Sequence, residues 1–307
     1  MTRDMPMCTC CGAQHWRRRR YTATTSYLEC LGCHYNIQVD EAAHDRTAQF
    51  EAEQQKFYDD GSLLLSAGFS PVNAEINRRR LSIVESHLPP GASVLEVGPG
   101  SGDFIFAMAD RGYSATAVEH SAALAAHLRE KEGLSVVVGD FADQDLPKAT
   151  YDAYCSFHVI EHVIDFKKHL GLARDCVKPG GYAFIATPNA RGWEHRLPFS
   201  LSPNYDSSHF QLFSADALTL ALREAGWDTA SIVTPSYSIA WLRIITKVLR
   251  RIRGQDENTT GGHYARSTSK SLKVATTTFA ALTRPLRYLQ EALSGGNELL
   301  VIARRAR

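Results

Sequence analysis

The 307-residue sequence predicts an α/β protein with a doubly wound, seven-stranded, mostly parallel sheet. Short β-branched runs alternate with helical runs between residues 91 and 235, as expected for parallel strands joined by helices. One of these strands runs directly into a glycine-rich loop, SVLEVGPGSG at 93–102. Acidic residues end the following strands, and the carboxyl ends of parallel strands meet at one edge of such a sheet.

Five parts of the chain differ in character. Residues 1–45 are rich in cysteine and arginine, residues 46–90 have the periodicity of a helical linker or cap, and residues 91–235 form the predicted core. Residues 236–295 predict a basic amphipathic helical insertion, and residues 296–307 hold the last strand of the core. The predicted core strands are Ser93–Val97, Ser114–Glu119, Leu134–Gly139, Tyr151–Phe157, Tyr182–Thr187, Thr229–Thr234 and Asn297–Arg305.

Composition sets limits on location and partners. The net charge is +1 and 44% of the residues are hydrophobic, which does not favour a nucleic acid or another highly charged partner. The sequence has no apolar run long enough for a transmembrane helix and no apolar signal region at its start. We therefore expect a cytoplasmic protein in a reducing compartment, where seven cysteines indicate metal ligands or free thiols.

Two cysteine pairs predict a zinc ribbon. Cys8 and Cys11 form one Cys-x-x-Cys pair, Cys30 and Cys33 form another, and the spacing between them suits a tetrahedral structural Zn²⁺. Free thiols are the alternative. The segment 16–21 between the pairs holds four consecutive arginines flanked by Trp and Tyr, a composition that would suit RNA contact. The near-neutral chain favours instead a ribbon that caps the fold or shapes the substrate entrance.

The glycine-rich loop is the strongest signal. The strand Ser93–Val97 leads into Gly98, Gly100 and Gly102, and a helix with apolar periodicity follows. Glycines let the backbone approach a ligand closely, and the helix N-terminus offers it free N–H groups. The spacing places Asp103 where a dinucleotide fingerprint needs a small residue, and no Lys-Ser/Thr pair indicates a phosphate-binding loop.

Acids at the next two strand ends point to a nucleoside. Glu119 lies twenty-one residues beyond Gly98, where an acid accepts the two ribose hydroxyls of a nucleoside. Asp140 would accept an adenine amine, and Phe141 would stack on the adenine ring. Each acid alone could be an ordinary loop residue, but their occurrence at successive strand ends favours a binding site.

The order of these motifs resembles one family. The motifs are LEVGPGSG, the strand ends at Glu119 and Asp140, HVIEHV, VKPGGYAFIATPN, SHFQLFS and AGW. Together they resemble the class I S-adenosylmethionine (SAM)-dependent methyltransferases. They are most similar to the broad bacterial group of ubiquinone-biosynthesis O-methyltransferases and methyltransferases of glycan gene clusters. The resemblance covers about residues 91–235 and the final strand.

The resemblance implies SAM as cofactor and assigns roles by position. Gly98, Gly100 and Gly102 would form the loop under the methionine part, Glu96 would orient its amino group, Glu119 would bind the ribose and Asp140 the adenine.

Residues after the fourth strand are candidates for the reaction itself. His158, Glu161 and His162 would share one face of a helical turn, and His209 could approach from a later loop. Three interpretations compete. These residues would act as general acid or base, hold a divalent metal, or only stabilise the loop. Some relatives use a Glu-x-x-Glu-His cluster for magnesium. Here His158 replaces the first Glu, which disfavours that oxygen-preferring ion.

The insertion carries a basic amphipathic segment at 241–253. Its apolar and cationic positions separate onto two helical faces, which suits either a lid packed on the protein or peripheral contact with the inner membrane surface. The predicted function is O-methylation of a small molecule, such as a sugar, a glycan precursor or a lipid-linked phenol. The alternatives are an RNA methyltransferase and a non-catalytic SAM-binding or zinc scaffold protein.

Overall fold

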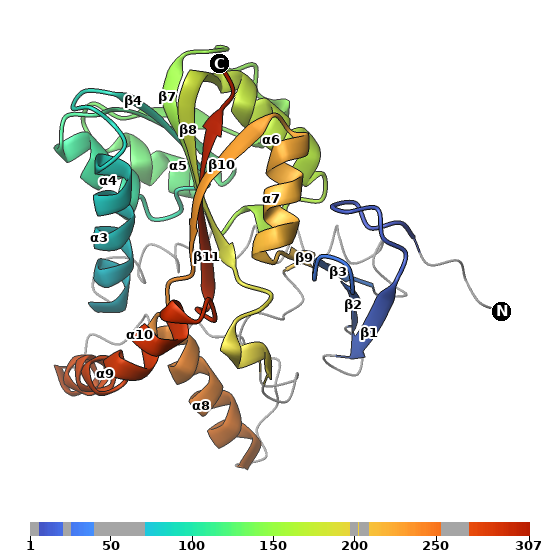
Figure 1. The fold of residues 1–307 in the computed structure, drawn as a ribbon. Coiled ribbons are helices and arrows are strands. Elements are labelled where there is room, and N and C mark those ends of the chain that lie inside the picture. Colours follow the sequence, from blue (N-terminus) through green and yellow to red (C-terminus); the bar gives the residue numbers. More distant parts are fainter. Residues whose placement is uncertain (1–5, 21–25, 40–70, 197–201, 203–208, 253–269) are drawn as a thin grey trace.

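A computed structural model describes most of the chain (Figure 1). The described residues are 6–20, 26–39, 71–196, 202, 209–252 and 270–307. Most of the predicted linker 46–90, the end of the arginine hairpin and the stretch 253–269 lie outside these residues.

The main sheet has seven strands in the order β10-β11-β8-β7-β4-β5-β6, which confirms the predicted fold class. All neighbours pair in parallel except β11, which is antiparallel to both β10 and β8. The strands are β4 (Ser93–Val97), β5 (Ser114–Glu119), β6 (Ser135–Val138), β7 (Tyr151–Phe157), β8 (Val177–Pro188), β10 (Trp227–Val233) and β11 (Glu298–Arg305).

Helices cover both faces of this sheet (Figure 1). Helices α3 (Pro71–Glu85), α4 (Asp103–Asp110) and α5 (Ala122–Arg129) lie on one face. Helices α6 (Phe166–Cys176) and α7 (Ala215–Glu224) lie on the other. Alternate strand residues enter the two cores, as on β11, where Leu299 and Val301 face one cluster while Leu300 and Ile302 face the other.

Two strands begin earlier than predicted. β8 starts at Val177, because Val177 already pairs with Tyr151. The Lys-Pro-Gly-Gly stretch that suggested a loop forms an irregularity within the strand, and regular pairing resumes where Tyr182 pairs with Ala153. β10 starts at Trp227, whose buried indole donates to the Leu170 carbonyl at 3.0 Å and so fixes the beginning of the strand on α6.

The N-terminal ribbon forms a second, antiparallel sheet. Its strands are β1 (Trp16–Arg20), β2 (Ser26–Cys30) and β3 (Asn36–Gln38), and the two-residue β9 (Gln211–Leu212) completes it. The prediction did not include β9, because two residues carry no periodicity. Buried ribbon residues share one hydrophobic cluster with α6 and α7, so the ribbon packs directly on the core.

The C-terminal insertion is helical, as predicted. It contains α8 (Ser238–Ile252), α9 (Lys270–Leu282) and α10 (Arg284–Ala292), with Pro285 in the first turn of α10 where a proline is tolerated. These helices lie beyond the carboxyl ends of the parallel strands (Figure 1). None of the helices in the described parts of the chain is long and apolar enough to cross a membrane.

Candidate functional site

The glycine loop joins β4 to α4 with an unusual backbone. Gly98, Gly100 and Gly102 have φ of 66°, 57° and 82°, a region that side chains other than glycine rarely adopt. A Cβ on Gly98 would lie 2.6 Å from Cγ2 of Val159, so the loop after β7 closes over this glycine. Gly102 caps α4 without a side-chain acceptor, which leaves first-turn N–H groups available to a ligand.

Two buried acids flank this loop. Glu96 is only 3% exposed, and its Oε2 has no hydrogen-bond partner among the described residues. Burial raises the pKa of Glu96 to about 8, although the charge of Arg80 opposes that rise. Glu119 accepts the N–H groups of Ser121 and Gly100 at 2.9 and 3.3 Å, and burial raises its pKa as well.

Asp140 and Phe141, which follow β6, form contacts within the protein. Asp140 is exposed and caps the short 3₁₀ turn η1 (Phe141–Asp143) by accepting the N–H of Ala142 at 2.7 Å. Phe141 is 5% exposed, and its ring lies in the core 4.9 Å from the His169 ring. The ring of Phe141 therefore packs against His169, and its stacking on adenine stays a prediction.

His158 lies directly after β7, and its side chain, which is 43% exposed, forms ion pairs with two buried carboxylates. Its φ of 60° is unusual for a residue other than glycine, and it turns the imidazole across the sheet edge toward β11. Nδ1 lies 3.1 Å from Oε1 of Glu161, and Nε2 lies 2.7 Å from Oε2 of Glu298. Arg80 donates to the same Glu298 oxygen at 2.7 Å, and Thr187 donates to Oε2 of Glu161 at 2.9 Å.

The two carboxylates determine the protonation of His158. Burial alone would lower its pKa, but the hydrogen bonds to Glu161 and Glu298 raise it to about 9. Each carboxylate needs an N–H from the ring, so the geometry is that of an imidazolium with no free lone pair. A general base needs a ring nitrogen with a free lone pair, and His158 in this protonation state has none.

A second group surrounds the turn that follows. Glu161, His162 and His209 each offer a ligand atom within 4.8 Å of the others, and the two imidazole rings are 4.8 Å apart. Glu161 and His162 belong to the 3₁₀ turn η2 (Ile160–His162), while His209 lies two residues before β9. His158 precedes that turn and is not in this group, so the single helical face predicted for 158–162 does not form.

The four ribbon cysteines converge on one point. Their sulfurs lie within 4.8 Å of one another, with Sγ–Sγ distances of 3.6 Å for Cys8–Cys33 and for Cys11–Cys30. Ligands held at 2.3 Å in a tetrahedron are about 3.8 Å apart, so the four thiolates fit a zinc ion.

Arg80, Glu298 and Gln211 were not predicted as site residues. Glu298 offered the clearest signal, since an ionisable residue opens a strand that is otherwise apolar and buried. Arg80 lies outside the quoted motifs, and Gln211 lies in SHFQLFS but received no role, because their partners are 48 to 218 residues away along the chain.

A cavity of about 540 Å³ lies beyond the end of β10. Thr234, Asn189 and Arg191 line it from the core, and Glu291, Leu293 and Ser294 line it from the end of the insertion. The helical insertion therefore lines part of a cavity at the carboxyl edge of the sheet.

Sequence comparison relates this chain to methyltransferases. A family model described as a methyltransferase domain matches residues 70–232. The ubiquinone biosynthesis O-methyltransferase of Azotobacter vinelandii is 28% identical over 228 residues, which is 72% of this chain and 90% of that protein. A probable S-adenosylmethionine-dependent methyltransferase of Mycolicibacterium smegmatis is 30% identical over 148 residues, covering 47% of this chain and 54% of that protein.

Two solved structures share the fold. The 1,6-didemethyltoxoflavin-N1-methyltransferase of Burkholderia thailandensis has a TM-score of 0.53 at 14% identity, over 94% of this chain and 99% of that one. A SAM-dependent methyltransferase of Archaeoglobus fulgidus has a TM-score of 0.50 at 20% identity, over 75% of this chain and 94% of that one. The family model covers more than half of the residues, and the glycine loop and sheet order agree with it. This chain therefore belongs to the class I SAM-dependent methyltransferase family.

Proposed function

We propose that the protein transfers a methyl group from SAM to an oxygen of a small molecule, such as a sugar, a glycan precursor or a lipid-linked phenol. The observation that carries this proposal is the pairing of two imidazoles with a buried carboxylate, Glu161, His162 and His209, at the carboxyl edge of the sheet. A hydroxyl acceptor must lose a proton during transfer, and an imidazole near neutrality can accept it.

The loop side of the site fits SAM. The unpartnered Glu96 carboxylate oxygen would meet the ammonium group of the methionine part, and the Gly98–Gly102 backbone would line that part. Glu119 would accept the ribose hydroxyls, since each carboxylate oxygen has room for a second donor. Bound SAM supplies an activated methyl on a sulfonium, and the protein has to position the acceptor against it.

We assign the proton acceptor to His162 or His209, and a positioning role to His158. The imidazolium of His158 holds Glu161 by one nitrogen and Glu298 by the other. Glu161 in turn lies against His162 and His209, where a negative charge favours the imidazolium formed when a proton arrives.

A divalent metal on Glu161, His162 and His209 is the competing interpretation. One carboxylate with two imidazoles suits a borderline transition metal better than magnesium. Both Glu161 oxygens already have protein partners, His158 and Thr187, so a metal would have to displace or share one of them.

A methyl-transfer screen tests this function. Labelled SAM would be offered with sugar nucleotides, quinone precursors and RNA. Turnover would be compared in His162→Gln, His209→Gln and the control His127→Gln, whose side chain is partly exposed and lies outside this group. We expect at least one of the first two variants to lose roughly a hundredfold in turnover while keeping SAM affinity. Wild-type turnover in both would contradict the base assignment, and activity lost to chelators and restored by one divalent ion would favour the metal.

For the ribbon, we propose a structural Zn²⁺ bound by Cys8, Cys11, Cys30 and Cys33. The 3.6 Å sulfur separations and the burial of three of the four cysteines support it. Metal analysis of protein purified without chelator should give one zinc per chain. A zinc content unchanged by Cys30→Ser with Cys33→Ser would place the metal elsewhere.

We also propose peripheral membrane contact through the helical insertion. Nine of the twelve large apolar side chains exposed in the described part of the chain lie on residues 238–293, including Ile245, Leu249 and Ile252 on one stripe of α8. Ile244 on the other side of that apolar face is buried, so α8 both packs on the protein and presents apolar surface outward. This would bring the carboxyl edge to lipid-linked acceptors.

Vesicle sedimentation separates the two roles of α8. Wild-type protein should bind vesicles that contain anionic lipid and not purely zwitterionic ones, because residues 238–292 hold ten Lys and Arg against three acids. Leu249→Ser with Ile252→Ser should abolish binding without lowering thermal stability. Equal binding of wild type and double variant would leave α8 as a lid only.

A further inference from the structure

We propose that Gln211 is a positioning residue through which the zinc ribbon sets the geometry of the reaction face. The inference rests on the proposed function of the Glu161, His162 and His209 group. It adds a physical connection from the proposed zinc-binding turn to that group, through side chains to which the sequence analysis assigned no role.

The connection begins at the second cysteine turn. The N–H of Cys30 donates to the carbonyl of Tyr35 at 2.8 Å, and Ser214, which caps α7, donates its hydroxyl to the carbonyl of Cys33 at 2.5 Å. The turn proposed to bind the metal therefore also fixes the position of the Tyr35 backbone. Because Tyr35 is 2% exposed, its ring has little freedom to move independently of this turn.

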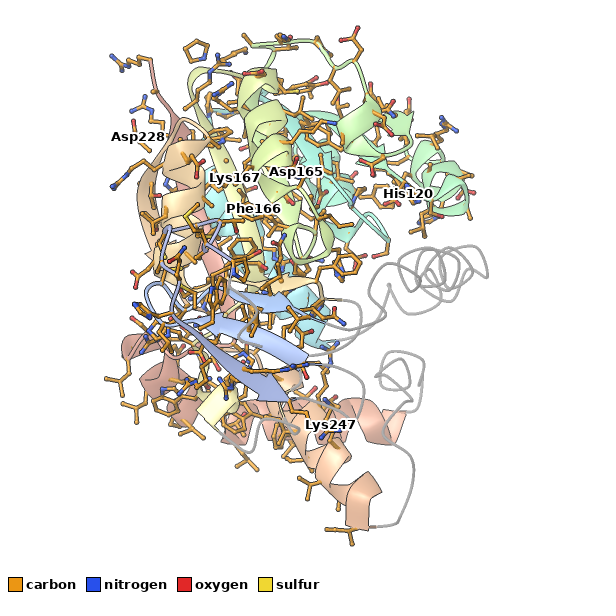
Figure 2. The ribbon with its side chains drawn as sticks, turned by 90° about the vertical axis from the view of Figure 1, so that its right-hand side faces the viewer. His120, Asp165, Phe166, Lys167, Asp228 and Lys247 are labelled. Carbon is orange, nitrogen blue, oxygen red and sulfur yellow. The ribbon has the colours of Figure 1, made fainter. Side chains whose placement is uncertain are left out.

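Tyr35 inserts between the ribbon and the core. Its ring lies 6.0 Å from Phe166 at the start of α6 and 5.3 Å from Phe213. Figure 2 shows the ribbon strands beside the end of α6 where Phe166 is labelled. The Tyr35 hydroxyl donates to Oε1 of Gln211 at 2.5 Å, so the ring carries a polar contact to the far side of the apolar layer.

Gln211 passes this contact to the turn. Its Nε2 donates to the carbonyl of Ile160 at 2.9 Å and to that of Val163 at 2.5 Å, the residues on either side of Glu161 and His162. The side chain is buried, so all three partners are needed to satisfy its amide. These bonds hold the Gln211 amide in one orientation. A movement of Tyr35 would therefore also move the turn at 160–163.

The ribbon also holds the other half of the group. Tyr27 on β2 is fully buried and donates its hydroxyl to the carbonyl of His209 at 2.9 Å. The N–H of Gln38 donates to the carbonyl of Phe210 at 2.8 Å, and Ile37 pairs with Gln211 across the β3–β9 ladder. The backbone segments that carry His209 and His162 are thus both held by hydrogen bonds that lead to the ribbon.

The SAM side of the site depends on other elements. Glu96 and Glu119 belong to β4 and β5, and the glycine loop joins β4 to α4; Val159, just before the turn, also lies close to Gly98. Loosening the ribbon should therefore reduce turnover more than SAM affinity. A ribbon that is only an attached module would leave both unchanged.

Two variants cut the connection without touching a cysteine. Tyr35→Phe removes only the hydroxyl that meets Gln211, and Gln211→Met removes the amide with little change in volume. The controls are Tyr113→Phe, a buried tyrosine outside the ribbon, and Arg18→Ala, an exposed ribbon residue. Zinc content, SAM affinity, turnover, acceptor KM and hydrogen exchange of residues 158–163 would be measured for each.

We expect one zinc and wild-type SAM affinity in all four variants. Tyr35→Phe and Gln211→Met should show faster exchange at residues 160–163 and a turnover lower by roughly ten- to a hundredfold, the scale of a small misplacement of reacting groups. Removal of zinc by a chelator should give the same exchange pattern in the full chain.

Unchanged exchange at residues 160–163 in both variants and in the zinc-free protein would overturn the proposal. So would a loss of turnover that is equal in the two controls. If the wild-type protein methylates none of the acceptors, the proposed function fails, while the exchange measurement still decides whether the ribbon holds the turn.

Discussion

Glu298→Gln tests the buried ion-pair chain at the sheet edge. One oxygen of Glu298 accepts both Arg80 and His158 at 2.7 Å, and the glutamate and arginine side chains are 3% and 10% exposed. Glutamine keeps the shape but removes the charge. Two cations would then face each other across a neutral amide.

The expected cost follows from the burial of the pair. Removing one partner of a buried ion pair costs about 3–5 kcal/mol, because the remaining charge loses its compensation without regaining water. For a chain of 307 residues, that corresponds to a fall in melting temperature of roughly 5–8 °C. Arg80→Met in the same chain should restore part of the loss, since it removes one of the two unpaired cations.

The pH dependence gives an independent sign. Burial alone would raise the pKa of Glu298, but Arg80 and His158 lower it from 4.5 to about 2. Its stabilising effect is thus complete above pH 4.5 and is lost as the pH falls toward 2. The raised pKa of His158 stabilises fully below pH 6.5, and that effect is lost as the pH rises through 9. Wild-type melting temperature should therefore decline from pH 6.5 to 9, and the decline should be smaller in Glu298→Gln.

Calorimetry or thermal fluorescence measures these effects against a matched exposed pair. Lys167 and Glu224 are 37% and 54% exposed, so Glu224→Gln should cost less than about 1 kcal/mol. The reasoning is refuted if Glu298→Gln is no more destabilising than Glu224→Gln at pH 6.

Three further results are expected. Glu119→Ala should weaken SAM binding by about 1–3 kcal/mol in isothermal titration through loss of the ribose acceptor, whereas the exposed Glu130→Ala should not; equal affinities would remove the ribose assignment. SAM binding should strengthen from about pH 6 to pH 8 and release a proton, because the SAM ammonium group favours the ionised form of Glu96, whose pKa is raised to about 8. Glu96→Gln should abolish this pH dependence of SAM affinity. RNA should not bind tightly at physiological salt; tight binding that is lost when residues 17–20 are changed to serine would favour an RNA substrate.

The sequence predicted the parts of the fold that depend on local pattern. Alternating apolar residues located every core strand, and the glycine loop adopts the positive φ that its spacing implied. The boundaries of β8 and β10 were less accurate, because a bulge and a buried tryptophan extended strands past their apparent turn signals.

The side-chain geometry of the site depended on distant contacts instead. The prediction placed His158 on a shared helical face, but its positive φ turns it to Glu298, which lies 140 residues later. The sequence also did not show that the ring of Phe141 lies close to the rings of Tyr154 and His169. Periodicity contains no information about either partner.

The pairing of β3 with β9 also affects the order of events during synthesis. Tyr35 and its partner Gln211 are 176 residues apart, and elongation at about 5–20 residues per second separates their synthesis by roughly 9–35 s. During that interval the cysteines would be free to bind the proposed zinc ion, while the ring of Tyr35 has no core to pack against. Metal supply to the nascent chain would then determine whether the N-terminal ribbon is compact before the core is synthesised, or remains an exposed and aggregation-prone segment.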